Sequence, residues 1–489
     1  MLLLRTLAIR QLEAAHQGSP LMERAGLAAA DLAGELVLDR CGAILVVAGG
    51  GNNGGDAYVC ARHLKARGHS VMVASPAATQ PLPPDAEAAR NDWLAMGGDI
   101  SAQLPDIKNY ALAIDGLFGI GLTRPIEGMY ADWIARLNAL SCPILALDTP
   151  SGLNADTGAI MGCCVRATHT LTFIAAKPGL YTLEGRDHAG NVHCATLDID
   201  ASSDATGEGR LISSADFESA LQARRHNSHK GSNGSAAIIG GASGMAGAAL
   251  LASRAALHLG AGRVYVGMLD PIPVDIQQPE LMLRSVADAI EQVSGSGGAI
   301  GIGPGLGQSD AALAALKLAI AANVPLAMDA DALNLIAAHP VLVKHIARRT
   351  APTVLTPHPA EAARLLGIST PDVQAQRISN TLQLAKRFNA AVVLKGSGSV
   401  VALPDGNWYI NATGNPALGT AGTGDVLLGV VTAFLAQQHD AATSLLAAVH
   451  LHGAAADALV VSGIGPIGLT AGELIMPART LWNSWIAAH

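Results

Sequence analysis

Residues 43–56 have the sequence AILVVAGGGNNGGD, in which a six-residue apolar run meets a loop of five glycines, two asparagines and an aspartate. The apolar run, 43–48, has the length and composition of a buried strand. A helix is predicted at 57–67, ending before Gly68, and a second strand at 70–74. Strand, turn, helix and strand together form a βαβ unit. This stretch therefore predicts a parallel sheet covered by helices, which is an α/β fold.

The loop at 49–56 has the composition of a ligand site. Its glycines let a ligand approach the backbone and allow positive φ, and the helix behind it presents unpaired N–H groups to an anion. Asn52, Asn53 and Asp56 add hydrogen-bond donors and acceptors. A glycine-rich turn without function is the alternative, and the density of polar residues argues against it. The spacing is not G-x-G-x-x-G, so a standard Rossmann dehydrogenase is not predicted.

Two further apolar runs end in an aspartate. The run 111–114 leads into Asp115, and 143–147 leads into Asp148. Because the carboxyl ends of parallel strands meet at one edge of a sheet, we expect these carboxylates to converge with Asn53. A single aspartate in such a place is often only a cap or turn residue. A set of oxygen ligands favours a hard cation over zinc.

Length and composition support the same fold class. The 489 residues are too many for one ordinary core, so two or three domains are expected. Half of the residues are hydrophobic but only 3% are aromatic, and there are 54 glycines, which suits a parallel α/β protein and excludes a disordered chain. The net charge of −8 argues against a nucleic-acid partner. We expect such an Ala- and Gly-rich chain to form a homo-oligomer.

The sequence predicts a cytoplasmic protein with no membrane partner. The most apolar stretch, 311–328, contains Lys317, and the leucine run before Arg5 is too short for a signal peptide. The cysteines form no Cys-x-x-Cys pair and have no histidine cluster beside them, so we expect reduced packing residues. They are Cys41, Cys60, Cys142, Cys163, Cys164 and Cys194.

The chain changes character near its middle. All the cysteines precede residue 195, and the stretch 198–230 is polar apart from a helix-like piece at 213–221. We therefore place a domain boundary near 205–225. The expected organisation is a domain at 1–210, a linker at 211–224 and a domain at 225–489.

The strongest signal of the second half is TAGTGD at 420–425, before an apolar helix predicted at 426–437. Gly422 and Gly424 let backbone N–H groups point into a pocket at the positive end of the helix dipole. That arrangement stabilises charge on a transferred phosphoryl group, and Asp425 is placed to take a proton from an attacking hydroxyl. A simple N-capping turn is the alternative, but it needs only one Ser, Thr or Asp.

The motifs of the first half resemble the NAD(P)H-hydrate epimerase family, the YjeF N-terminal domain. They are GGGNNGGD, DGLFGIGL, DTPSGL and FIAAKPGL, with LMERAG near the start. The resemblance spans nearly the first 200 residues and implies a three-layer α/β/α, Rossmann-like fold that binds a hydrated nicotinamide nucleotide and a potassium ion. Asp148 is the implied residue for proton handling, and Ala57 stands where many relatives have glycine. The implied substrate-binding residues are Asn52, Asn53, Gly54, Gly55, Asp56, Gly119, Ile120, Gly121, Leu122, Thr123, Arg124, Pro125 and Asp148. The implied potassium ligands are Asn53, Asp115 and Ser151.

The motifs of the second half resemble the ADP-dependent NAD(P)H-hydrate dehydratase family of the ribokinase-like superfamily. They are GGASGMAGAA, GPGLG, DADAL, TPHPAE, KGSGS and GTGD, within residues 225–489. The resemblance implies a second three-layer α/β/α domain with Asp425 as catalytic base and with ADP and magnesium. It leaves open whether Asp329 and Asp331 are structural or position magnesium. The implied nucleotide contacts are Lys395, Gly396, Ser397, Gly398, Ser399 and Gly424. The implied hydrate contacts are Ala248, Gly307, His358 and Asp425.

Together the two resemblances imply repair of damaged nicotinamide nucleotides. The first domain would interconvert the R and S forms of NAD(P)H hydrate, and the second would dehydrate the S form at the expense of ADP, giving AMP and phosphate. Two alternatives remain: a hydroxymethylpyrimidine-type kinase with a non-catalytic N-terminal binding domain, or an N-terminal domain that binds RNA or partner proteins. ADP or ATP as donor, and NADH or NADPH as the preferred nucleotide, are left open.

Four aromatic or imidazole residues are interpreted without function. His450 and His452 are two apart on a predicted helix, so they do not share a face and are taken as satisfied helix histidines. Trp482 and Trp485 are expected to anchor the last helix.

Overall fold

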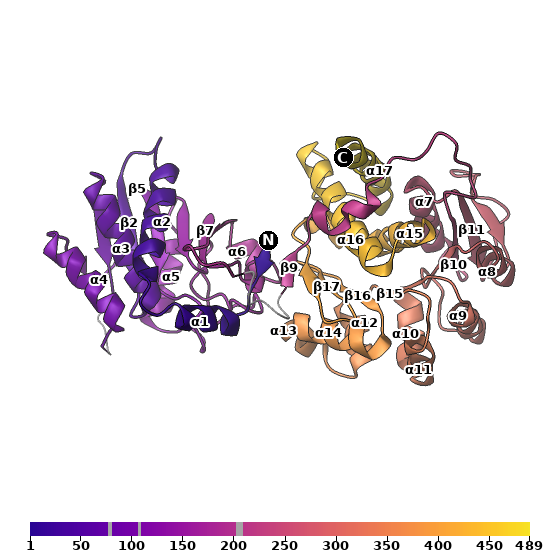
Figure 1. The fold of residues 1–489 in the computed structure, drawn as a ribbon, viewed down its shortest axis with the longest axis horizontal. Coiled ribbons are helices and arrows are strands. Elements are labelled where there is room, and N and C mark those ends of the chain that lie inside the picture. Colours follow the sequence, from indigo (N-terminus) through magenta and orange to yellow (C-terminus); the bar gives the residue numbers. More distant parts are fainter. Residues whose placement is uncertain (77–80, 106–108, 202–208) are drawn as a thin grey trace. The chain divides into compact units, whose positions relative to one another are not determined.

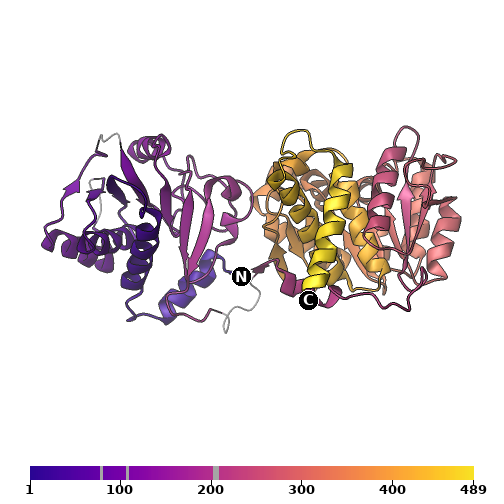
Figure 2. The same cartoon turned by 90° about the horizontal axis from the view of Figure 1, so that it is seen from above.

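The computed structural model describes residues 1–76, 81–105, 109–201 and 209–489. The chain folds as two compact units, Met1–Gly209 and Arg210–His489. Each unit is built around a mainly parallel sheet with helices on both faces (Figures 1 and 2). The predicted pair of three-layer α/β/α domains is therefore confirmed.

The sheet of the first unit has the strand order β4-β3-β2-β5-β6-β7-β8, and all neighbouring strands are parallel. The strand order reverses between β2 and β5, and in open α/β sheets ligands bind at the carboxyl ends beside such a point. The strands are β2 (Ala43–Ala48), β3 (Val71–Ala74), β4 (Ile100–Ser101), β5 (Tyr110–Gly116), β6 (Ile144–Leu147), β7 (His169–Phe173) and β8 (Asn191–Ala195), after a short β1 (Leu2–Leu3).

Alternating side chains of β2 divide the apolar core of the first unit between the two faces of the sheet. Ile44 and Val46 lie in one cluster with the helices α1 to α4, whereas Leu45 and Val47 lie in another with α5. This alternation is the period-two pattern of a strand buried on both faces. The helices are α1 (Thr6–Ala15), α2 (Leu21–Leu36), α3 (Asn52–Ala66), α4 (Pro84–Ala95), α5 (Met129–Asn138), α6 (Gly185–His188) and η1 (Pro178–Leu180).

Helix α3 corrects the prediction for the glycine-rich loop. The helix starts at Asn52, five residues before the predicted start, so Asn52–Asp56 form its first turn. No glycine between 49 and 55 has a positive φ. These glycines provide close packing instead: a Cβ at Gly54 would lie 2.0 Å from the Gly49 carbonyl oxygen, and one at Gly55 would lie 2.5 Å from Met22 Cε. The prediction that these glycines are needed for positive φ was therefore wrong, because they are needed for close packing.

The sheet of the second unit runs β9-β18-β17-β16-β15-β14-β13-β10-β11-β12. Its strands are parallel except at β16–β17 and β17–β18. The strands are β9 (Gly209–Leu211), β10 (Ser235–Gly240), β11 (Arg263–Met268), β12 (Met282–Arg284), β13 (Ala299–Ile302), β14 (Leu326–Met328), β15 (Thr353–Leu355), β16 (Ala391–Leu394), β17 (Val400–Ala402) and β18 (Trp408–Ile410).

Two groups of helices cover this second sheet (Figure 1). One face carries α7 (Ala246–His258), α15 (Thr423–Ala436), α16 (Ala441–Val461) and α17 (Ile475–Ala488), with η2 (Ser214–Ala220), η3 (Pro416–Gly419) and η4 (Ala471–Leu474). The other face carries α8 (Val286–Ser294), α9 (Asp310–Ala321), α10 (Ala330–Ala338), α11 (Val341–Ala347), α12 (Pro359–Leu366), α13 (Thr370–Ala375) and α14 (Arg377–Phe388). By length and composition α16 could span a membrane, but most of it is buried inside the protein, so we assign it as a core helix.

The segment predicted as a linker, 211–224, belongs to the second unit, while residues 202–208 of the polar stretch lie outside the described residues. The segment begins at the end of β9, which pairs with β18. Phe217 of η2 is 1% exposed, and its ring lies 6.2 Å from that of Trp482 and 6.0 Å from that of Trp485. Trp482 also packs on Phe434 of α15 at 4.5 Å, so the prediction that these tryptophans anchor the last helix is confirmed.

Phe217→Ala should destabilise the second unit by about 3–5 kcal/mol, because it leaves a cavity between η2, α16 and α17. Urea unfolding followed by tryptophan fluorescence, to which Trp482 and Trp485 contribute, measures the change. Glu218→Ala, at a neighbouring exposed position, is the matched control and should change stability by less than about 0.5 kcal/mol. A loss near zero for Phe217→Ala would show that 211–224 is a linker after all.

Candidate active sites

The carboxyl ends of β5 and β6 bring together the acids predicted in the first unit. Asp115 is fully buried and accepts hydrogen bonds from the backbone N of Ser151 at 2.8 Å and from its Oγ at 2.6 Å. Phe118 N donates to the same Ser151 Oγ at 2.9 Å. Burial raises the pKa of Asp115 to about 6, although the hydrogen bonds from Ser151 act in the opposite direction.

The side chain of Asn53 lies close to Asp148 and has an amide group without hydrogen-bond partners among the described residues. Both the Nδ2 and the Oδ1 atom of this amide are buried. A Cβ at Gly119 would lie 3.3 Å from Asn53 Cγ and 3.2 Å from Asp148 Oδ2, so the three residues surround one small space that a side chain at 119 would enter. Because unpaired buried amides are costly, this one indicates a ligand or cation in that space.

Asp148 is held in an uncommon backbone conformation, with φ of +62°. Its backbone N donates to Leu171 O at 2.7 Å, and Ile120 N donates to its Oδ2 at 3.4 Å. The Nζ of Lys177 donates to Asp148 Oδ1 and, at 2.8 Å, to Phe173 O. Such a strained residue needs surroundings that over-determine it, and positions of this kind cluster at active sites.

Two more carboxyl groups interact electrostatically with the Asp148–Lys177 pair. Burial and then the charge of Asp148 raise the pKa of Asp56 well above its ordinary range. The same two causes, in the same order, raise the pKa of Glu13 on α1. Sequence analysis missed Glu13 and Lys177; the quoted motif FIAAKPGL contains Lys177, but its pairing with Asp148 depends on the fold.

The predicted substrate loop at 119–125 lies beside Asp148 at its start and is exposed further along. Gly119 and Ile120 contact Asp148, as described above, whereas Gly121, Thr123, Arg124 and Pro125 are exposed. Asn52 is also exposed, next to the buried Asn53.

In the second unit, α15 starts three residues before the predicted helix, so Asp425 lies in its first turn. Gly422 caps this helix with a φ of +91°. A Cβ at Gly424 would lie 3.2 Å from Lys395 Nζ, so a side chain there would crowd the end of this lysine. Burial, followed by the charge of Asp329, raises the pKa of Asp425 to about 7, and the charge of Lys395 opposes this shift.

The acids of DADAL have separate partners. Asp329 is buried and receives hydrogen bonds from Lys395 Nζ at 2.7 Å and 3.0 Å, one to each oxygen. Asp331 accepts a hydrogen bond from Gly307 N at 2.8 Å. Asp329 therefore fixes the end of Lys395, and Asp331 fixes the glycine loop that follows β13.

The remaining predicted residues of the second unit lie around these groups. Ala248 lies close to the glycine loop, since a Cβ at Gly305 would be 3.3 Å from the Cβ of Ala248. His358 caps α12: its Nδ1 accepts from Ala360 N at 3.1 Å, and its Nε2 lies 3.1 Å from Glu361 Oε1. Both ring nitrogens of His358 thus have protein partners, which favours a capping role.

The KGSGS loop at 395–399 is held by a residue that sequence analysis missed. Arg377 of α14 is buried and donates to the carbonyl oxygens of Leu394 at 3.2 Å, Lys395 at 3.4 Å and Gly398 at 3.3 Å. Burial lowers its pKa to about 10. Nothing in the helical pattern of α14 distinguishes this arginine from a surface residue.

The interpretation of the two α16 histidines needs a correction. They lie in different surroundings as predicted, His450 against Phe217 at 5.5 Å and His452 near Thr423 and Lys395. However, Nδ1 of His450 and Nε2 of His452 are buried without a hydrogen-bond partner among the described residues, so one ring nitrogen of each histidine is unsatisfied. Burial lowers the pKa of His452 to about 4, which makes it a neutral group near the start of α15.

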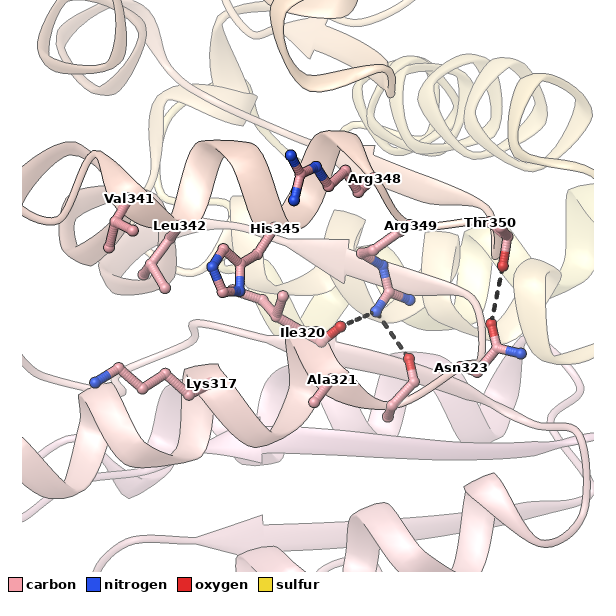
Figure 3. Close-up of a pocket in the computed structure, with 11 residues that line it drawn as sticks. Lys317, Ile320, Ala321, Asn323, Val341, Leu342, His345, Arg348, Arg349 and Thr350 are labelled. Atoms are coloured by element: carbon pink, nitrogen blue, oxygen red, sulfur yellow. Dashed lines mark hydrogen bonds between the residues drawn. The ribbon is translucent and has the colours of Figure 1, made fainter.

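A separate pocket of about 610 Å³ lies between α9 and α11, lined by Lys317, His345 and Arg348 among others (Figure 3). Its residues precede β14 and β15, so it lies at the amino ends of these strands, away from Asp425. Arg349 in this pocket donates to the carbonyls of Ile320 and Ala322, which makes it a cap for the end of α9.

Two α/β units, each with buried acids at the carboxyl edge of its sheet, define a bifunctional α/β enzyme. The sequence model of the NAD(P)H-hydrate dehydratase family matches residues 236–470, and that of the YjeF-related protein N-terminus matches 18–179. The chain is 39% identical to the bifunctional NAD(P)H-hydrate repair enzyme Nnr of Escherichia coli, covering 90% of this chain and 85% of that one. It is 36% identical to the corresponding enzyme of Leishmania braziliensis, covering 94% and 88%.

Among solved structures, the chain is similar to the ADP/ATP-dependent NAD(P)H-hydrate dehydratase of Bacillus subtilis, co-crystallised with ATP and Mg²⁺. The match has 31% identity and a TM-score of 0.49, and it covers 57% of this chain and 99% of that one. From its relatives and the two family matches, the chain belongs to the family of bifunctional NAD(P)H-hydrate repair enzymes, with an epimerase unit followed by a dehydratase unit.

Proposed function

We propose that the chain repairs hydrated nicotinamide nucleotides: the first unit interconverts the R and S forms of NAD(P)H hydrate, and the second dehydrates the S form with ADP as phosphoryl donor, giving AMP and phosphate. Direct loss of water is slow because hydroxide is a poor leaving group, whereas phosphate leaves readily. The observation that carries the proposal is the start of α15, where Asp425 lies beside glycine-flanked N–H groups and the anchored Lys395.

In the dehydratase step, Asp425 takes the proton of the substrate hydroxyl as it attacks the phosphoryl group. The N–H groups at the start of α15 stabilise the charge on that group. Lys395, with Gly396, Ser397, Gly398, Ser399 and Gly424, binds the nucleotide, while Ala248, Gly307 and His358 border the hydrate.

Magnesium fits this second site. A Mg²⁺ ion that accompanies a nucleotide needs only one or two carboxylates, because phosphate oxygens and water complete its coordination. Asp331, held beside Gly307, would supply a carboxylate, whereas Asp329 is already engaged by Lys395. When bound, the ion would neutralise charge on the phosphates.

In the epimerase step, Asp148 handles the proton that is exchanged at the hydroxyl group, and residues 52–56 with the 119–125 loop bind the nucleotide. A potassium ion fits beside them. The unsatisfied Oδ1 of Asn53, the buried Asp115 and the Oγ of Ser151 form an oxygen-rich set that a hard monovalent cation suits. It would position the substrate and offset the buried negative charge.

We further propose a cytoplasmic homo-oligomer without nucleic-acid or membrane partners. The Ala- and Gly-rich composition, which can bury apolar surface between copies, supports an oligomer.

The full chain, incubated with mixed NADH hydrate, ADP and Mg²⁺, should regenerate NADH from both epimers with release of free phosphate. Absorbance of NADH and a phosphate assay follow the reaction, and ATP replaces ADP in a parallel run. A flat absorbance trace contradicts repair, and a stable phosphorylated product without free phosphate would favour the kinase alternative.

Asp425→Asn should lower dehydration about 10²–10⁴-fold, because it removes the general base, while epimer exchange continues. Asp148→Asn should have the opposite pattern. Dehydration is followed with pure S epimer, and exchange is followed by NMR without nucleotide. Each variant's retained activity is the control for correct folding. If both changes lower the same activity, the division of labour between the units is wrong.

The dehydration kcat/KM should fall about tenfold between pH 8 and pH 6. The reason is that the pKa of Asp425, raised by burial to about 7, leaves this base mostly protonated below neutral pH, and kcat/KM reports groups of the free enzyme. Initial rates with low concentrations of S epimer across pH 5–9 give the profile. A midpoint below pH 5 would show that an ordinary, solvated carboxylate limits the rate.

A further inference from the structure

The epimerase unit contains a lysine with no exposed surface. Lys177 has 0% exposure, and its Nζ contacts only protein groups, Asp148 Oδ1 and Phe173 O, among the described contacts. Removing an ammonium group from water is costly unless it is paired and hydrogen-bonded. Replacement of such a pair by apolar residues often leaves stability unchanged or higher. A contribution to folding stability is therefore a weak explanation for the presence of a buried lysine at position 177.

The pair has a consequence for the carboxyl groups around it. Facing Asp148 are Ile120 N from the 119–125 loop, Asp56 from α3, and Glu13 from α1. Lys177 donates a hydrogen bond to Asp148, whereas no such bond to Asp56 is found among the described residues. Burial and the charge of Asp148 raise the pKa of Asp56 well above its ordinary range. The two neighbouring carboxyl groups therefore have different surroundings, as an acid and a base of one reaction require.

We propose that Lys177 is a positioning residue for epimerisation, which fixes Asp148 as the carboxylate base and thereby leaves the neighbouring Asp56 as the acid. The proposal rests on the epimerase activity proposed above. It goes further by assigning the two proton-transfer roles and the residue that separates them.

The reaction balances with water as the only other participant. In the hydrate, the carbon that carries the hydroxyl group is bonded to the ring nitrogen. Asp56 gives its proton to this hydroxyl, the C–O bond breaks, the nitrogen lone pair forms a C=N bond, and water leaves. Water then adds to the opposite face, the C=N electrons return to nitrogen, and Asp148 takes the released proton. Transfer of that proton back to Asp56 through water restores the site, without oxidation or reduction.

The test uses four full-length proteins: the natural chain, Lys177→Met, Asp148→Asn and the double variant. Epimer exchange above the uncatalysed background is measured by NMR without nucleotide, and dehydration of pure S epimer by the second unit confirms the enzyme concentration. We expect Lys177→Met to lower the kcat of exchange about 100-fold, the lower range for loss of an acid–base group. KM should change less than threefold, because the lysine does not reach the substrate.

The double variant separates positioning from a purely structural role. If Lys177 acts through Asp148, the double variant exchanges epimers at the rate of Asp148→Asn alone, so the two losses do not multiply. This comparison remains valid if Lys177→Met alone unfolds the unit, because the double variant removes both buried charges. A further loss of tenfold or more in the double variant, or exchange within threefold of the natural chain in a folded Lys177→Met, would overturn the proposal. Absence of exchange in the natural chain would instead refute the epimerase function itself.

Discussion

Each unit has a lysine paired with a buried aspartate at the carboxyl edge of its sheet, next to a second aspartate whose pKa is raised. In the first unit Lys177 holds Asp148 beside Asp56, and in the second Lys395 holds Asp329 beside Asp425. The effect has the same physical origin in both: one carboxylate has a cation, and the desolvated neighbour has its negative charge nearby. Because the lysine is bonded to one acid of each pair, the pKa of the other acid is raised, for Asp425 to about 7.

The two sites differ in which acid the proposed chemistry uses as base. In the dehydratase unit the unpaired acid, Asp425, removes the proton, and the paired Asp329 serves to place Lys395 beside Gly424. In the epimerase unit the paired acid, Asp148, accepts the proton. This difference follows from the substrates. In the proposed dehydratase reaction the nucleotide phosphate needs Lys395 as a charge partner, so Asp329 only anchors this lysine. The proposed epimer exchange transfers no phosphoryl group, and Lys177 stays buried behind Asp148.

The sequence allowed prediction of the elements that depend on local pattern. The strands β2, β5 and β6 lie within about two residues of their predicted bounds, because each is a continuous apolar run closed by an aspartate or glycine. It could not predict features that depend on long-range packing. Lys177 acts through the carboxylate of Asp148 and Arg377 through the carbonyl of Gly398, and both of these partners are distant in sequence. The segment 211–224 was predicted as a linker because the stretch 198–230 around its helix-like piece is polar, and the burial of Phe217 depends on α16 and α17.

Helix starts were the least predictable feature, for a steric reason that also explains the composition. Both α3 and α15 begin within their glycine motifs, where a Cβ would collide with the Gly49 carbonyl or approach Lys395. Further along α15, a Cβ at Gly429 would lie 2.1 Å from Ala252 O of α7. The small residues of the chain therefore let helices dock closely. That docking fixes where the first turn of α15 points its N–H groups, and hence where Asp425 lies relative to them.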